Sequence, residues 1–335
     1  MEATRSYVFD RGAFDEVYDR VEAGLLTQTV RLLQLVPLLG FETALHPQVT
    51  LASGLVIRLM EDAEVSAALQ TGLPDQATST ATGRTVPQAY QRALVKVSSY
   101  PVRVGEVPGP VEAPVSIEEE ALRLQIALRL VCGGSVTLGR PLQMQHPGDF
   151  DADRGYSASL TRVEVPDENR LTILYSPGQV AEVEEMMVML TDPAVTGNRS
   201  LQMAIRRLVS SGSRGLAEDR LVDLMVAAEA LFIHGAGHGR TQQKRALIAV
   251  GAAALLGGDP ELGVSAADIS CFIGGAYVRR NHEVHADPTP PAATALLDGT
   301  PSASLHATVE DLEHLMRRAA TLTIKTTVSV AQRVP

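Results

Sequence analysis

Residues 216–232 read LAEDRLVDLMVAAEALF and carry the clearest structural signal in the chain. Apolar side chains recur there at intervals of three and four residues, which places them on one side of an α-helix: Leu221, Leu224, Met225, Ala228, Leu231 and Phe232. A glycine-rich stretch at residues 235–239 ends the pattern. We therefore expect an amphipathic helix that buries one face against neighbouring helices.

Most of the chain after residue 178 shows the same helical pattern. Proline and glycine punctuate it, as at Asp192-Pro193 and Gly257-Gly258. Further helices are predicted at residues 180–190, 200–210, 241–256, 265–285 and from 308 past 324. Because the connections are short, residues 179–335 are predicted to form an all-α helical bundle.

Residues 1–178 are more mixed and are predicted to form an α+β N-terminal domain. One helix is expected over residues 14–35. A second is expected over residues 116–131, where Ser116 precedes three glutamates and Gly133-Gly134 follows. A loop is expected where four prolines fall within residues 101–114. Extended segments are predicted at residues 49–60 and 136–145, with a hairpin formed by 160–165 and 170–175.

The composition limits the classes of function. The 335 residues include 29 Lys and Arg against 39 Asp and Glu, which gives a formal net charge of −10. An extended basic coat for nucleic acid is therefore excluded, because phosphate binding needs clustered cations. With 6 Phe, 7 Tyr and no Trp, the chain has few aromatic side chains on which single-stranded bases could stack.

The sequence predicts no targeting signal. Its first twenty residues lack the charged start and apolar core of a signal peptide, and no apolar run reaches about 18 residues. The two cysteines, Cys132 and Cys271, are too few for a disulfide framework. We expect a cytoplasmic protein with reduced thiols and no membrane contact.

The chemistry-bearing segment is residues 277–287, YVRRNHEVHAD. Two arginines, one asparagine and two histidines crowd into residues 279–285, directly before the prolines at 288, 290 and 291. One interpretation is a charged helix end, since cations near a C-terminus suit the helix dipole. The other is a catalytic or ligand-binding site.

Here the sequence resembles the HEPN domain, and in particular the Apea-like HEPN family. Arg280-Asn281-His282-Glu283-Val284-His285 matches the R-N-x-x-x-H motif of that domain. Residues 221–231, LVDLMVAAEAL, are similar to the family pattern L-x-D-L-x-x-A-L-E-A-L, with Ala228 in place of a leucine. Residues 246–256 resemble the following alanine-rich helix, and the resemblance spans about residues 198–330.

This resemblance implies a homodimeric, metal-independent endoribonuclease that uses no cofactor and cleaves RNA through the 2′-hydroxyl. Arg280 would bind the scissile phosphate and stabilise the transition state, and His285 would act as general acid or base. Asn281 would position the phosphate or His285. Glu229 would brace the site arginine, although a solvent-facing glutamate is an equal alternative. His282 could assist, although a variable filler position is favoured.

The spacing of the motif adds a geometric constraint. At about 100° per residue, the side chains of Arg280 and His285 leave a regular helix about 140° apart. Either the helix distorts at its end, or two copies of the chain meet at one site. A zinc cluster of His234, His238, His282 and His285 is disfavoured, because the first two flank glycines and do not share a helix.

The resemblance suggests a toxin or antiviral-defence enzyme that a phage or nucleotide trigger activates. Many HEPN toxins carry a modifiable tyrosine two residues after the histidine, where this chain has Asp287. The target residue of that route is therefore absent at this position, and residues 1–178 are a better hypothesis for the sensor. The alternative function is a non-catalytic HEPN module for dimerisation or nucleotide binding.

Overall fold

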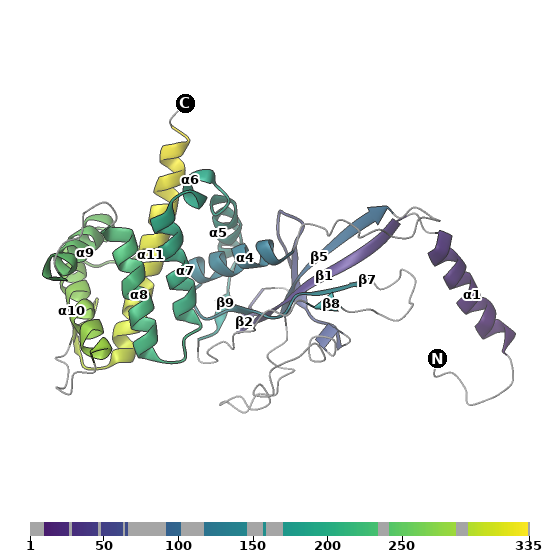
Figure 1. Cartoon of the computed structure of the whole chain (residues 1–335), viewed down its shortest axis with the longest axis horizontal. Helices are drawn as coiled ribbons and strands as arrows, with labels where there is room; N and C mark the ends of the chain where they lie inside the picture. Colours follow the sequence, from purple (N-terminus) through teal and green to yellow (C-terminus); the bar gives the residue numbers. More distant parts are fainter. Residues whose placement is uncertain are drawn as a thin grey trace.

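A computed structural model of the chain describes residues 10–26, 29–45, 48–62, 64–65, 92–101, 117–145, 157–158, 170–233, 241–285 and 294–333. A sheet lies at one side of the molecule and a group of helices at the other (Figure 1). Helix α4 (Ile117–Val131) lies between them, and helix α1 (Arg11–Leu26) lies at the far end of the sheet.

The main sheet of the described residues is antiparallel, with the order β3-β4-β5-β1-β7-β8, and β6 also pairs with β1. Its longest pair is β1 with β5, whose register runs from Thr29 opposite Pro101 to Leu38 opposite Arg92. The strands are β1 (Thr29–Leu39), β3 (Gln48–Thr50), β4 (Val56–Leu59), β5 (Arg92–Pro101), β6 (Thr137–Leu138), β7 (Leu142–Gln145) and β8 (Ser157–Ala158).

The predicted helix over residues 14–35 is wrong in its second half. Helix α1 ends at Leu26, and residues 29–39 form the central strand β1. Every residue from Leu33 to Leu39 is buried, so this strand is covered on both faces. A strand buried on both faces loses the alternation that identifies half-buried strands, and its apolar run resembles a buried helix.

Two other strand predictions need correction. Residues 49–60 form the hairpin of β3 and β4, which turns at Gly54 with a φ of 82°. Strand β9 (Thr172–Leu174) pairs in parallel with β2 (Phe41–Thr43), whereas a local hairpin was expected. Residues 159–169 and most of the expected loop at 101–114 lie outside the described residues.

The second half of the chain is helical, as predicted. Helix α11 is central to it, because it contacts every helix from α4 to α10. The helices are α5 (Pro177–Met189), α6 (Pro193–Thr196), α7 (Arg199–Gly212), α8 (Ala217–Phe232), α9 (Thr241–Leu256), α10 (Ala266–Val284) and α11 (Leu305–Ala331). The short strands β10 (Thr294–Ala295) and β11 (Pro301–Ser302) form a small antiparallel pair between α10 and α11.

The hydrophobic core is continuous across residue 178. It runs from Ile57 and Leu94 in the sheet, through Leu124 and Leu128 of α4, to Leu312 in α11. Helix α4 contributes to both parts, since it contacts β1 and β6 as well as α5, α7 and α11. The sheet and the helical bundle therefore share one buried surface.

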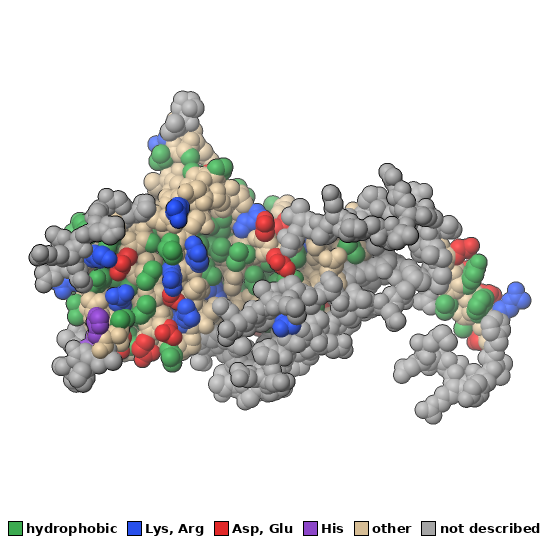
Figure 2. Space-filling model, in the orientation of Figure 1, with side chains coloured by type: hydrophobic (Ala, Val, Ile, Leu, Met, Phe, Trp, Pro, Cys, Tyr) green, Lys and Arg blue, Asp and Glu red, His purple; other side chains and the backbone are tan. Residues whose placement is uncertain are grey.

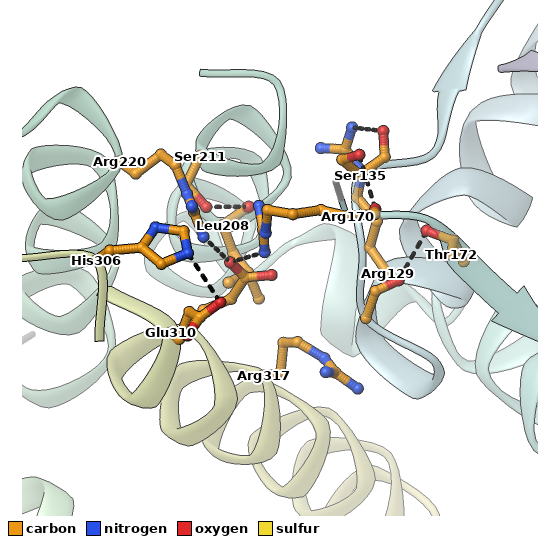
Figure 3. Close-up of polar contacts among 12 residues, drawn as sticks. Arg129, Ser135, Arg170, Thr172, Leu208, Ser211, Arg220, His306, Glu310 and Arg317 are labelled. Carbon is orange, nitrogen blue, oxygen red and sulfur yellow. Dashed lines mark hydrogen bonds and ion pairs between the residues drawn. The ribbon is translucent and has the colours of Figure 1, made fainter. Parts of the chain in front are cut away.

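Arginines connect the two parts at this junction (Figure 3). The side chains of Arg170 and Arg220 point to one carboxylate, that of Glu313 on α11. The Arg220 Nη2 atom lies 2.8 Å from Glu313 Oε2, and the exposed fractions of these two side chains are 3% and 9%. Such burial makes the carboxylate depend on its two partners, because an unpaired buried charge is strongly unfavourable.

Two further arginines satisfy carbonyl groups at helix ends. Arg317 of α11 donates to the carbonyl oxygens of Leu130 and Val131 at the end of α4. Arg129 of α4 donates to the carbonyl oxygen of Val209 near the end of α7. Cationic side chains suit these positions, since the last carbonyls of a helix carry partial negative charge. The arginines thus connect α4 to α7 and α11.

Replacing Glu313 should destabilise the whole chain. We expect Glu313→Ala to lower the free energy of unfolding by about 3–5 kcal/mol, because two buried guanidinium groups lose their counter-charge. Urea denaturation followed by circular dichroism measures this change. The control is Glu310→Ala on the same helix, where the carboxylate is 55% exposed and lies 3.1 Å from His306. That control should change the free energy by less than about 1 kcal/mol, and equal effects would contradict the assignment.

Candidate functional site at the end of helix α10

Helix α10 carries the candidate site on its last turns. Its first turn is capped by Ser265, whose hydroxyl oxygen accepts a hydrogen bond from the Asp268 backbone N–H at 3.2 Å. Its buried side follows the helical period and comprises Ile269, Phe272, Ile273, Ala276 and Tyr277. The predicted helix at residues 265–285 is confirmed within one residue at each end.

The opposite side of α10 faces solvent. Ala267, Cys271, Val278 and His285 are exposed, and their spacing of 4, 7 and 7 residues places them on one stripe. Gly274 lies on the same stripe, and a Cβ atom built there would meet nothing within 4 Å. His285 therefore lies at the end of an open, largely apolar face.

Arg280 is half-buried on a different side of the helix. Its Nη1 atom donates to the Asn281 side-chain oxygen at 3.1 Å. Its Nε atom is buried and has no hydrogen-bond partner within the described part of the chain. No carboxylate of a described residue pairs with Arg280, so its charge is uncompensated there.

Arg279 has a different environment, although it is the same residue type at the preceding position. Its Nε atom lies 2.7 Å from Glu283 Oε1, and its Nη1 atom donates to the Ala303 carbonyl oxygen at 3.4 Å. These contacts hold the end of α10 to the segment before α11. Glu283 neutralises Arg279, which leaves Arg280 as the arginine of this pair that can attract an anion.

Tyr277 lies close to both Arg280 and Glu229. Burial raises the pKa of the Tyr277 hydroxyl, the charge of Glu229 raises that pKa further, and Arg280 lowers it. Glu229 on α8 is half-buried, and its Oε2 atom lies 3.9 Å from the Lys244 Nζ atom. The ion pair of Glu229 in this structure is thus with Lys244 of α9.

The remaining motif residues lie on the last turn of the helix. His282 is half-buried, with its Nδ1 atom 3.9 Å from Glu283 Oε1. Asn281 is also half-buried, and its carbonyl oxygen accepts the His285 backbone N–H at 3.1 Å. Sequence reasoning gave Tyr277 no role, although its position three residues before Arg280 places the two side chains on neighbouring parts of one helix face.

The helix does not distort between the two main motif residues. It is regular to Val284, and the His285 N–H still makes the helical bond to the residue four positions earlier. Arg280 and His285 therefore project about 140° apart from one α10, and a single regular helix does not aim both at one phosphate.

Neither a metal-ion cluster nor a membrane-spanning helix occurs among the described residues. No group of three or more His, Cys, Asp or Glu side chains among them could hold a metal ion. His234 and His238 lie outside the described residues, as does Asp287. No helix in the described part of the chain is long and apolar enough to cross a membrane.

Comparison of the chain with protein-family models, with curated proteins and with solved structures gives no match.

The two cysteines should differ in reactivity, and this difference tests which side of α10 is exposed. Cys271 is exposed on the open stripe, whereas burial raises the pKa of Cys132 to about 11. At pH 8 only about one part in a thousand of Cys132 is thiolate, the form that reacts. Limited iodoacetamide treatment followed by peptide mass spectrometry should therefore label Cys271 well before Cys132. Faster labelling of Cys132 would contradict the orientation of α10.

Proposed function

We propose that this chain is a metal-independent HEPN endoribonuclease of toxin or antiviral-defence type that acts in the cytoplasm as a homodimer. The observation that carries the proposal is Arg280, which pairs with no carboxylate of a described residue and is held by Asn281 near the end of α10, with His285 exposed five residues further along. The R-N-x-x-x-H motif and the helical half of the chain support the same assignment.

The chemistry needs only these side-chain types. A neutral histidine takes the proton of the RNA 2′-hydroxyl, whose oxygen then attacks the adjacent phosphorus. A protonated histidine returns a proton to the departing 5′-oxygen. Arg280 binds the phosphate and stabilises the additional negative charge of the transition state. The products are a 2′,3′-cyclic phosphate and a 5′-hydroxyl.

A second copy of the chain supplies the missing geometry in this proposal. Since Arg280 and His285 diverge on one helix, each site would combine Arg280 of one protomer with the partner's His285. Exposed apolar side chains on α9 and α10 offer a surface for this contact, namely Leu247, Val250, Leu255, Val278 and Val284.

Substitution of the two main residues tests the catalytic assignment. We expect wild-type protein to cleave labelled RNA in EDTA, and Arg280→Ala or His285→Ala to reduce the rate at least about 100-fold. Gel analysis of the fragments, with chemistry specific for cyclic phosphate ends, measures both rate and product. Melting temperatures of the variants exclude simple unfolding.

Arg279→Ala is the matched control, because it removes the same charge from the neighbouring position. Its ion pair with Glu283 is lost, so we expect a modest loss of stability but a rate within about threefold of wild type. Cleavage that EDTA abolishes would contradict the metal-independent mechanism. If the wild-type protein cleaves no RNA, even during phage infection or with added nucleotides as activators, the alternative of a non-catalytic HEPN module is favoured.

Mixed dimers test whether the site is shared between protomers. Heterodimers of Arg280→Ala and His285→Ala chains, isolated with two different affinity tags, contain one complete site if each site takes Arg280 and His285 from different copies. We expect about half of the wild-type rate per dimer. If both residues act within one protomer, neither site is complete and the heterodimer stays as inactive as the two parent variants.

Regulation forms the second part of the proposal. Residues 1–178 would receive a phage or nucleotide trigger and transmit it to the bundle, and the buried surface that α4 shares with the sheet and with α11 offers a route. Substitutions confined to the sheet should abolish the response to the trigger and leave the basal rate of RNA cleavage unchanged. That result would support separate sensing and catalytic parts.

A further inference from the structure

Helix α7 has an unusual charge for this acidic chain. Its sequence RSLQMAIRRLVSSG contains Arg199, Arg206 and Arg207 and no acidic residue. The chain as a whole has 39 acidic against 29 basic residues, so a helix with three arginines and no carboxylate departs from its composition. Arg199 also lies at the first position of the helix, where the dipole disfavours a cation.

The exposed side of α7 presents these charges. Arg199, Met203 and Arg206 are exposed, and their spacing of four and three residues aligns them on one face. The two arginines are two turns apart, which corresponds to about 10 Å along the helix axis. Neither takes part in an ion pair with any residue that the structure describes.

The neighbouring arginines are held in place by one buried carboxylate. Arg207 and Arg214 lie 2.8 and 2.9 Å from the two oxygens of Asp223, whose side chain is 4% exposed. Asp223 thus carries one negative charge between the two guanidinium groups of Arg207 and Arg214. Arg199 and Arg206 add two further positive charges on the exposed side of α7.

The surface view shows this charge on the outside of the bundle. Figure 2 shows a row of Lys and Arg side chains over α7, and His side chains on the same face near the lower end of α10.

We propose that the α7 face, formed by Arg199, Met203, Arg206, Arg207 and Arg214, binds the sugar–phosphate backbone of the RNA. The inference rests on the proposed ribonuclease function and extends it, because it assigns a contact surface outside the α10 motif. Guanidinium groups bind phosphate oxygens in a planar, charge-assisted geometry, and such contacts position a strand without reading its sequence. Met203 supplies an apolar contact between Arg199 and Arg206, which form no ion pair with a described residue.

An RNA backbone suits this surface better than a protein partner. The face is a narrow row of cations with one apolar side chain, whereas protein interfaces have an apolar core and are depleted of charge there. The overall charge of −10 repels nucleic acid at long range, so binding must come from local contacts and must depend steeply on salt.

The test compares two pairs of substitutions that remove the same charge. Arg199→Gln with Arg206→Gln alters the α7 face, and Arg11→Gln with Arg123→Gln alters i,i+4 ion pairs on α1 and α4. The probe is a fluorescent 20-nucleotide 2′-O-methyl RNA, which lacks the nucleophile and stays intact. Its dissociation constant is measured by anisotropy from 20 to 300 mM salt.

We expect the α7 pair to weaken binding about tenfold at 150 mM salt and to reduce the slope of log K against log salt by about 1.4, or 0.7 per phosphate contact. The control pair should leave the slope unchanged. On cleavable RNA, the α7 pair should raise KM and leave kcat unchanged. Equal slopes for the two pairs, or no binding by wild type at 20 mM salt, overturns the proposal.

The outcome is separable from that of the proposed function. RNA binding that depends on α7 without any cleavage supports this surface and contradicts the ribonuclease activity. Cleavage that needs Arg280 but is unaffected by the α7 pair supports the activity and overturns this surface. Polyglutamate of equal charge that competes as well as RNA would indicate an acidic protein partner and would also overturn it.

Discussion

The carboxylate of Glu313 is the contact on which the arrangement of the chain depends. It lies on α11, the helix that contacts every helix from α4 to α10, and it binds Arg170 from the segment before β9 and Arg220 from α8. Each of these partners belongs to a different part of the chain. A buried charge of this kind contributes little net stability compared with apolar packing, but it tolerates no arrangement that leaves it unpaired. It therefore selects one relative position of sheet and bundle among the many that apolar contacts alone would allow.

The sequence predicts helices where each helix buries a single side. Helices α8 and α10 have regular apolar stripes, and Gly133 with a φ of 76° ends α4 where glycine was expected to end it. Prediction from the sequence fails for strands that pack against or pair with segments distant in the chain. Strand β1 is covered on both faces, so its sequence has no alternation, and the parallel pairing of β9 with β2 joins residues about 130 positions apart. Neither fact is encoded in local periodicity.

In the candidate site too, local sequence predicts some features and distant packing partners determine the others. Its location follows from the motif, whereas the difference between Arg279 and Arg280 depends on which guanidinium group has a carboxylate beside it. A signal was present, since Glu283 follows Arg279 by four residues and such pairs meet on a helix surface. The position of Lys244 beside Glu229 could not be predicted, because it depends on how α9 packs against α8. The sequence thus identifies the residues, and tertiary packing decides which charges remain available.

Helix α4 also limits how the chain could be activated. Although it precedes the bundle in the sequence, it packs against α5, α7 and α11, and its Leu124 and Leu128 side chains are fully buried in the shared core. A proteolytic cut near residue 178 would not release an independently folded bundle, because the C-terminal fragment would expose that surface to water and leave the carbonyl group of Val209 without the Arg129 side chain. In the proposed regulation, a signal from the N-terminal part would therefore reach the bundle through an intact polypeptide, as a shift in packing rather than as a separation of fragments.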